Sequence, residues 1–113
     1  MKIELLYFDG CPSWRTARAR LTEALDHLGR PDQAVHLVRV ASDEQAEALR
    51  FAGSPTLLVD DEDLFPHPTG RHGLACRLYA TPDGLAGSPT VGELVGALSP
   101  RARPAPRATP ALR

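Results

Sequence analysis

The chain has few cysteines, few aromatic residues and no long apolar run. Its 113 residues include two cysteines, Cys11 and Cys76, and a single tryptophan. No apolar stretch reaches the ~20 residues that cross a bilayer, and the charged start MKIELLYF does not resemble a secretory signal. We therefore expect a cytoplasmic protein without a membrane partner, whose two cysteines stay reduced rather than forming a static disulfide.

Acidic residues are absent from residues 99–113, SPRARPAPRATPALR, which contain four arginines and four prolines. Without these arginines the formal charge of the chain changes from −1 to −5. An acidic body argues against nucleic acid as the main partner. A segment so rich in proline and arginine cannot bury enough apolar surface to fold. We predict one domain over residues 1–98 and a disordered tail over 99–113, which is either inert or a weak anionic contact.

Hydrophobic periodicity predicts four strands and three helices. The strands are expected at residues 2–8, 34–40, 56–60 and 74–80, and the helices at 12–28, 42–50 and 90–98. Ser42 with Gln45, and Thr90 with Glu93, have the spacing of capping boxes. A strand–helix–strand–helix start implies parallel pairing, whereas the last two strands can pair antiparallel. The predicted fold class is α/β, a β-α-β-α-β-β-α chain forming a mixed four-stranded sheet with helices on both faces.

Cys11 lies between a strand end and a helix start, in the stretch FDGCPSW. With Cys11 at the N-cap and Pro12 at the first helical position, the sulfur would face the free amide groups of the first turn. Such a position favours the thiolate, which is the reactive form of cysteine. Arg15 would add positive charge and Asp9 would oppose it. We interpret Cys11 as a catalytic nucleophile; the alternative is a buried cysteine that only packs.

The tetrapeptide Gly-Ser-Pro-Thr occurs at residues 53–56 and again at 87–90. The second copy precedes a capped helix, and we interpret it as part of a loop. The first copy opens a predicted buried strand, and the topology brings it beside the start of the first helix. Ser54 and Pro55 are therefore candidate substrate-binding residues. Trp14 either lines the same groove or starts the core stripe of its helix.

The element order, the Cys-Pro after the first strand and the Ser-Pro-Thr before the third resemble the thioredoxin-like fold in its glutaredoxin-sized form. The stretches LLYFDGCPSW, FAGSPTLLVD and GLACRLYATPDGLAGSPT are similar to a small thioredoxin-like family of bacterial proteins, over about residues 2–98. Some of its members carry a paired thiol or selenol, and some are labelled alkylmercury lyase. The resemblance implies a cis Ser54–Pro55 bond lying against Cys11.

The second cysteine of a Cys-x-x-Cys pair is missing, because Trp14 stands at its position. A lone thiol needs another thiol to release a mixed disulfide, and external glutathione or another low-molecular-weight thiol could supply it. Alternation along residues 74–80 predicts Cys76 on a sheet face, about 10 Å from the active edge at the usual strand rise. A disulfide needs Cα atoms within ~7 Å. A folded-back connection over residues 61–74 would change this geometry, so Cys76 is a possible second thiol.

The leading hypothesis is a monothiol, thioredoxin-like oxidoreductase in which Cys11 exchanges with a thiol or disulfide of a small molecule or protein. One alternative is a non-enzymatic module that binds a peptide, a thiol compound or a soft metal. Another is a scaffold that has lost its chemistry, and a third is alkylmercury lyase-like handling by Cys11, Cys76 and Asp9. His67 and His72 form only a weak metal signal, and the acids at 60–63 suit a solvated hairpin tip. We predict no bound metal and no resident cofactor.

Overall fold

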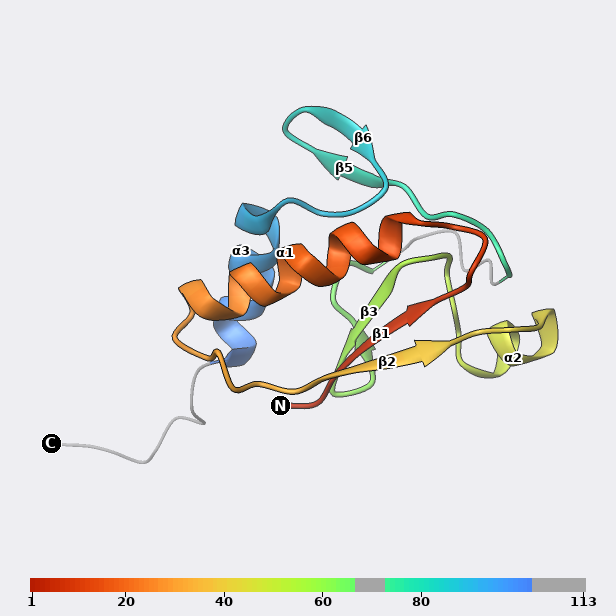
Figure 1. Cartoon of the computed structure of the whole chain (residues 1–113), viewed down its shortest axis with the longest axis horizontal. Coiled ribbons are helices and arrows are strands. Elements are labelled where there is room, and N and C mark those ends of the chain that lie inside the picture. The colour runs from red at the N-terminus through yellow and green to blue at the C-terminus, as the bar shows by residue number, and fades with distance from the viewer. Residues whose placement is uncertain (67–72, 103–113) are drawn as a thin grey trace, which may run out of the picture.

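The computed structural model describes residues 1–66 and 73–102 (Figure 1). Six strands and three helices follow one another in the order β1 Ile3–Tyr7, α1 Ser13–His27, β2 Val35–Arg39, α2 Asp43–Ala48, β3 Thr56–Val59, β4 Glu62–Asp63, β5 Tyr79–Thr81, β6 Gly84–Ala86 and α3 Val91–Ala102. Among these described residues, no helix has the length and apolar character needed to cross a membrane.

A mixed four-stranded sheet, with strand order β2-β1-β3-β4, forms the centre of the fold. β1 pairs in parallel with β2, as the crossover through α1 requires. β3 runs antiparallel to β1, with Leu6 opposite Thr56, and β4 runs antiparallel to β3. The C-terminal end of β1 and the N-terminal end of β3 therefore meet at the same edge of the sheet. The predicted α/β class and mixed four-stranded sheet are confirmed.

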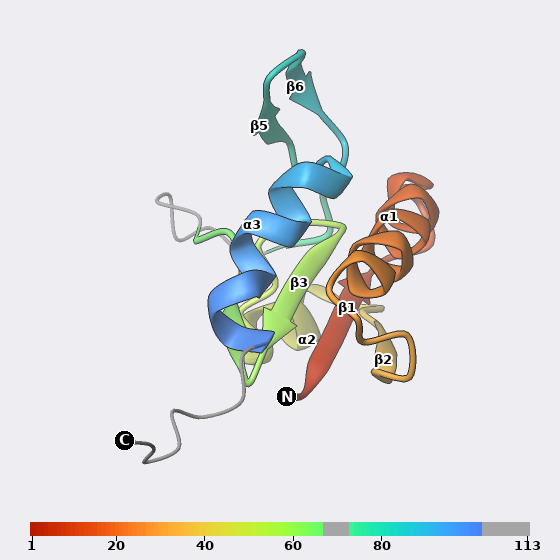
Figure 2. The same ribbon diagram turned by 90° about the vertical axis from the view of Figure 1, so that its left-hand side faces the viewer.

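Two helices cover one face of the sheet. α1 and α3 lie side by side (Figures 1 and 2). The buried stripe of α1 repeats at helical spacing, as predicted from periodicity. It packs with residues of β1, β3 and α3 in the main core, whose buried members are Ile3, Leu5, Ala17, Leu21, Ala24, Leu25, Leu57, Val59, Leu64, Leu94 and Leu98.

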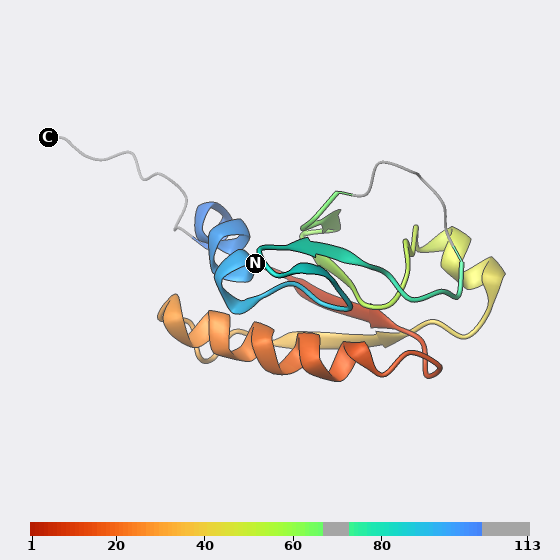
Figure 3. The same cartoon turned by 90° about the horizontal axis from the view of Figure 1, so that it is seen from above.

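The opposite face carries a smaller cluster built around α2. Leu6 points away from the main core because successive strand residues alternate between faces. It packs with Val40, Ala46 and Phe51, all buried. Figure 3 shows α2 at the end of the sheet, beyond the C-terminal end of β2. Ser42 caps α2 as predicted, accepting a hydrogen bond from the Gln45 amide at 3.1 Å.

The predicted fourth strand, over residues 74–80, is wrong. The fourth strand of the sheet is β4, which follows β3 through a turn at Asp60 and Asp61, both with positive φ. This turn is the hairpin tip predicted for the acidic run. Residues 79–81 form β5 instead, which pairs with β6 in a hairpin apart from the sheet (Figures 1 and 2). The two-residue turn puts β4 directly beside β3, so residues 74–78 are free to follow another path.

The third helix continues beyond its predicted end at residue 98. Thr90 and Glu93 form the expected capping box, with the Glu93 amide donating to Thr90 Oγ1 at 3.1 Å and the Thr90 amide donating to Glu93 Oε1 at 3.0 Å. α3 then runs through Ala102 and includes Pro100. Arg101 in its last turn donates to the Val59 carbonyl at 3.3 Å and to Glu62 Oε1 at 3.1 Å. The first four residues of the predicted tail are therefore helical, and residues 103–113 lie outside the described part.

Candidate thiol site

Cys11 lies one residue before the N-cap of α1. The helix begins at Ser13, and its N-cap is Pro12, which has no side-chain group to cap it. The Cys11 amide donates to the Phe8 carbonyl at 3.3 Å, which closes the turn after β1, and the first helical turn starts with the Arg15 amide bound to the Pro12 carbonyl. The predicted N-cap position of Cys11 is therefore wrong by one residue, because the first helical hydrogen bond is accepted by the residue after it.

The Cys11 side chain is fully buried and contacts the chain just before β3. Its exposed fraction is 0%, and its Sγ donates to the Ser54 carbonyl at 3.6 Å. Ser54 Oγ accepts a hydrogen bond from the Phe8 amide at 3.4 Å, which connects the chain just after β1 to the chain just before β3. The Ser54–Pro55 bond is cis, as the sequence resemblance implied, and both residues are buried. Three predicted site residues, Cys11, Ser54 and Pro55, thus lie together.

Cys76 lies directly opposite Ser54, in an isolated parallel β-bridge. The Ser54 amide donates to the Ala75 carbonyl at 2.8 Å, and the Arg77 amide donates to the Ser54 carbonyl at 2.9 Å. The same Ser54 carbonyl therefore accepts from the Cys11 thiol and from the residue after Cys76. The separation of about 10 Å expected from strand rise is wrong, because residues 74–78 cross the sheet edge instead of extending the sheet.

The two cysteines are neighbours through Ser54, whose carbonyl accepts from the Cys11 thiol and whose backbone is bridged to Cys76. The pKa of the Cys76 thiol is raised, first by a hydrogen bond with the Cys11 side chain, then by partial burial and by the negative charge of Cys11. Cys76 is nevertheless exposed, whereas we expected it to fill a sheet face. Both cysteines are free thiols. The structure thus brings together two thiols that are 65 positions apart in the sequence.

Gly53 allows the segment around Cys76 to approach so closely. Its φ is +113°, a backbone conformation that side chains with a Cβ rarely adopt. A Cβ at this position would lie 2.9 Å from the Arg77 Cβ and 3.2 Å from the Ala75 carbonyl oxygen. The glycine of the first Gly-Ser-Pro-Thr is therefore needed for contact between the two chain segments.

A buried ion pair anchors the residue after Cys76. The Arg77 side chain is 2% exposed, and its guanidinium donates to the two carboxylate oxygens of Asp63 at 2.8 and 3.3 Å. It also donates to Thr56 Oγ1 at 3.4 Å and to the Phe65 carbonyl. A buried guanidinium needs such partners, because desolvating an unpaired charge is costly. The sequence analysis missed Arg77 and Asp63, because it expected Cys76, rather than Arg77, to fill the packed face of residues 74–80.

Tyr79 connects the same segment to Pro55. Its hydroxyl donates to the Pro55 carbonyl, and the Arg77 guanidinium lies 4.7 Å from the centre of its ring. Burial raises the pKa of Tyr79 well above the ordinary tyrosine value, although the nearby positive charge of Arg77 works in the opposite direction. The segment that carries Cys76 is therefore bound to Ser54 through its backbone and to Pro55 through the Tyr79 hydroxyl.

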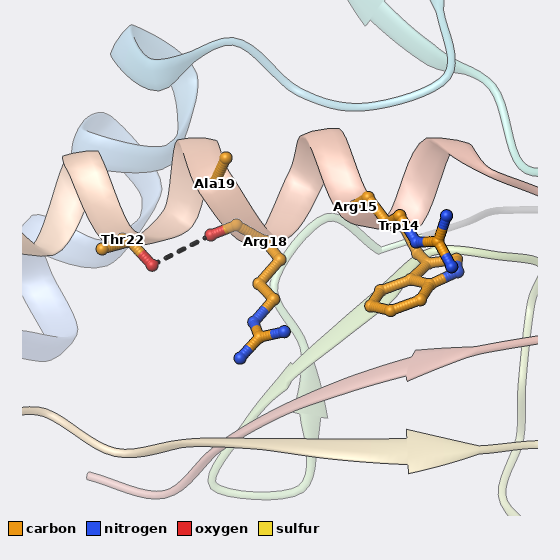
Figure 4. Close-up of a pocket in the computed structure, with 5 residues that line it drawn as sticks. All are labelled: Trp14, Arg15, Arg18, Ala19 and Thr22. Carbon is orange, nitrogen blue, oxygen red and sulfur yellow. Dashed lines mark hydrogen bonds between the residues drawn. The ribbon is translucent and has the colours of Figure 1, made fainter.

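Trp14 packs against the sheet from the first turn of α1. Its ring stacks on Tyr7 with centroids 4.2 Å apart, and it packs on the main core. The Arg15 guanidinium lies 5.2 Å from the centre of the indole ring. A surface groove of about 520 Å³ runs along this helix, and Trp14, Arg15 and Arg18 are among the residues that line it (Figure 4). Trp14 thus packs on the core and also lines a surface groove, but the residues that line this groove do not include Cys11, Ser54 or Pro55.

The remaining candidate ligands do not gather around the thiols. Asp9 forms an exposed ion pair with Arg39 at 2.7 Å. Within residues 1–66 and 73–102, no three His, Cys, Asp or Glu side chains are grouped to hold a metal ion. His67 and His72 lie outside the described residues. In the described part of the chain, the chemically distinctive feature is the pair of neighbouring thiols.

Comparisons with known proteins add no relative for this chain. No protein-family model, no curated protein and no solved structure matches it.

Proposed function

We propose that this protein is a thioredoxin-like thiol–disulfide oxidoreductase whose redox pair is Cys11 and Cys76. The observation that carries the proposal is the position of both cysteines at Ser54: the Ser54 carbonyl accepts from the Cys11 thiol, and a backbone bridge places Cys76 opposite Ser54. The mixed four-stranded sheet with its three helices is compatible with a thioredoxin-like fold. The internal thiol replaces the external one that a monothiol mechanism would need to resolve each mixed disulfide.

The reaction conserves atoms and electrons. The reduced pair gives up two protons and two electrons to a partner disulfide RS–SR′, forming the Cys11–Cys76 disulfide and releasing RSH and R′SH. A low-molecular-weight thiol such as glutathione, supplied at the cytoplasmic redox poise, returns the pair to its reduced state. The substrate class is a disulfide on a small molecule or protein, and the protein's own role is to hold two thiols beside Ser54.

A redox titration tests this function. The wild-type protein would be equilibrated in buffers of reduced and oxidised dithiothreitol, and its free thiols would be counted by alkylation and intact mass. We expect both thiols to disappear together and to return together, in one two-electron transition. Cys11→Ser and Cys76→Ser should each abolish that transition and the reduction of insulin disulfides. Independent oxidation of the two thiols, or persistence of both under oxidising conditions, would exclude the redox pair.

A soft-metal site is the second candidate, because two adjacent thiols can hold a two-coordinate soft cation. Cleaving a carbon–mercury bond would also need an acid, and the Asp9 carboxylate is instead paired with Arg39. Titration with HgCl₂, followed by ultraviolet absorbance of the thiolate complex, distinguishes the functions. One equivalent bound by the wild type and lost in either cysteine variant, with no turnover of insulin, would favour metal binding over exchange.

A further inference from the structure

The two sulfurs of the pair differ in their access to solvent. Cys11 has an exposed fraction of 0%, and its Sγ is bound to the Ser54 carbonyl. Cys76 is exposed, in the segment that crosses the sheet edge outside Ser54. Thiol–disulfide exchange requires the attacking sulfur to reach a sulfur of the partner, so access restricts which thiol can react first.

The elements around Cys11 keep a large partner away from it. Cys11 follows β1 and precedes α1, its Sγ is bound to the Ser54 carbonyl, and Ser54 and Pro55 are themselves buried. The bridge from Ser54 to Ala75 and Arg77 places Cys76 next to this buried site. A folded protein bearing a disulfide would therefore meet the Cys76 sulfur without any movement of the chain.

We propose that Cys76 is the attacking thiol, and that the buried Cys11 is the resolving thiol. This inference rests on the proposed redox pair and assigns an order to its two members. It reverses the order expected from the sequence, in which the cysteine before the first helix attacks. The preferred substrate is accordingly a disulfide exposed on a protein or peptide, which can be reached by a surface thiol.

Each step conserves atoms, electrons and protons. The Cys76 sulfur attacks one sulfur of RS–SR′, forming a Cys76–S–S–R mixed disulfide and releasing R′S⁻, which takes up the proton lost by the Cys76 thiol. The Cys11 thiol then loses its proton to solvent as its sulfur attacks the Cys76 sulfur; this forms the Cys11–Cys76 disulfide and releases RS⁻, which takes up a proton from solvent. Two protein thiols are oxidised, and one partner disulfide is reduced to two thiols.

The raised pKa of Cys76 adds a pH dependence to the first step. The neighbouring Cys11 side chain is the first cause of the rise. Because the thiolate is the attacking form, attack by Cys76 should become faster as the pH increases. The order of the two thiols therefore follows from their access to solvent, and Cys11 is the nucleophile of the second step.

Trapping of mixed disulfides tests the order. Cys11→Ser and Cys76→Ser would each be mixed with insulin, and covalent adducts would be followed by intact mass. We expect the adduct through Cys76 in Cys11→Ser to form at least about tenfold faster than the adduct through Cys11 in Cys76→Ser, because exchange rates depend on access. A smaller ratio, or the opposite one, would overturn the proposed order.

A second measurement avoids the variants, since Cys11→Ser alters a buried position. Wild-type protein reacting with insulin would be quenched with acid within seconds, and the cysteine carrying the insulin chain would be mapped by mass spectrometry. We expect Cys76; an insulin chain on Cys11 would refute the inference. Failure of the proposed function is distinguishable, because it appears separately as absence of the internal disulfide in the redox titration.

Discussion

Arg77, the residue after Cys76, forms a bidentate ion pair with Asp63 of β4, and its guanidinium is buried. Residues 75–79 also contact the chain just before β3 at two points. One is the backbone bridge to Ser54, and the other is the hydrogen bond from Tyr79 to the Pro55 carbonyl. Because it fixes the path of residues 74–79, this pair positions Cys76 beside Cys11 without touching either sulfur.

Asp63→Asn should therefore be strongly destabilising. Removing the carboxylate leaves a buried guanidinium charge without compensation, at a cost of about 3 kcal/mol. Urea unfolding of the reduced protein measures this change. Glu62→Gln is the matched control, because its ion pair with Arg101 is on the surface and should contribute no more than about 0.5 kcal/mol. Equal losses in the two variants would contradict a special role for the buried pair.

The thiol of Cys11 should control the acidity of Cys76. In Cys11→Ala the hydrogen bond and the negative charge that raise the pKa of Cys76 are both absent. The pKa of Cys76 should therefore fall towards that of an ordinary free thiol. The measurement is the rate of Cys76 alkylation by iodoacetamide as a function of pH, with the labelled peptide identified by mass.

Ser13→Ala is the control for this experiment, since it changes a neighbouring residue at the start of α1 and keeps both thiols. Its Cys76 profile should match that of the wild type. A Cys76 profile that does not move in Cys11→Ala would mean that the two side chains do not interact in solution.

Tyr79→Phe should lower stability by about 1–2 kcal/mol, because the Pro55 carbonyl loses a buried hydrogen-bond donor. The effect should also depend on pH. The pKa of Tyr79 is raised in the folded protein, so above about pH 10 the unfolded chain loses a proton that the folded chain keeps. The free energy of unfolding of the wild type should then decrease with pH, by up to about 1.4 kcal/mol per pH unit.

The difference between wild type and Tyr79→Phe in urea unfolding, measured from pH 8 to 11, isolates this contribution. It should be constant below about pH 10 and should shrink above it. Tyr7→Phe, which keeps the ring stacked on Trp14, is the control and should show no such trend. A difference that stays constant to pH 11 would exclude a buried, protonated Tyr79.

Trp14→Ala should reduce the free energy of unfolding by about 2 kcal/mol, since a half-buried indole loses its contacts with Tyr7 and the main core. Arg15→Ala, one position further, removes only an exposed cation over the indole ring and should cost about 0.5 kcal/mol. Thermal unfolding of both variants provides the comparison. Similar effects in the two variants would mean that Trp14 makes no substantial contribution to the core.

Sequence reasoning predicted the local elements of this fold better than the distant contacts of its site. The strands around Leu5 and Leu57, the stripe of α1 and the capping boxes at Ser42 and Thr90 all follow from short-range patterns. Ser54 and Pro55 could be placed near Cys11, because parallel crossover and strand order restrict where the start of β3 can lie.

The sequence by itself determined that Cys11 follows a buried strand and precedes a helix, because apolar periodicity and the Cys-Pro junction act over a few residues. Only the tertiary structure decided that Cys76 is its neighbour. That contact depends on the turn after β3, on the absence of a side chain at Gly53 and on the pairing of Arg77 with Asp63. These are long-range conditions on the path of the chain, and no local pattern around Cys76 expresses them.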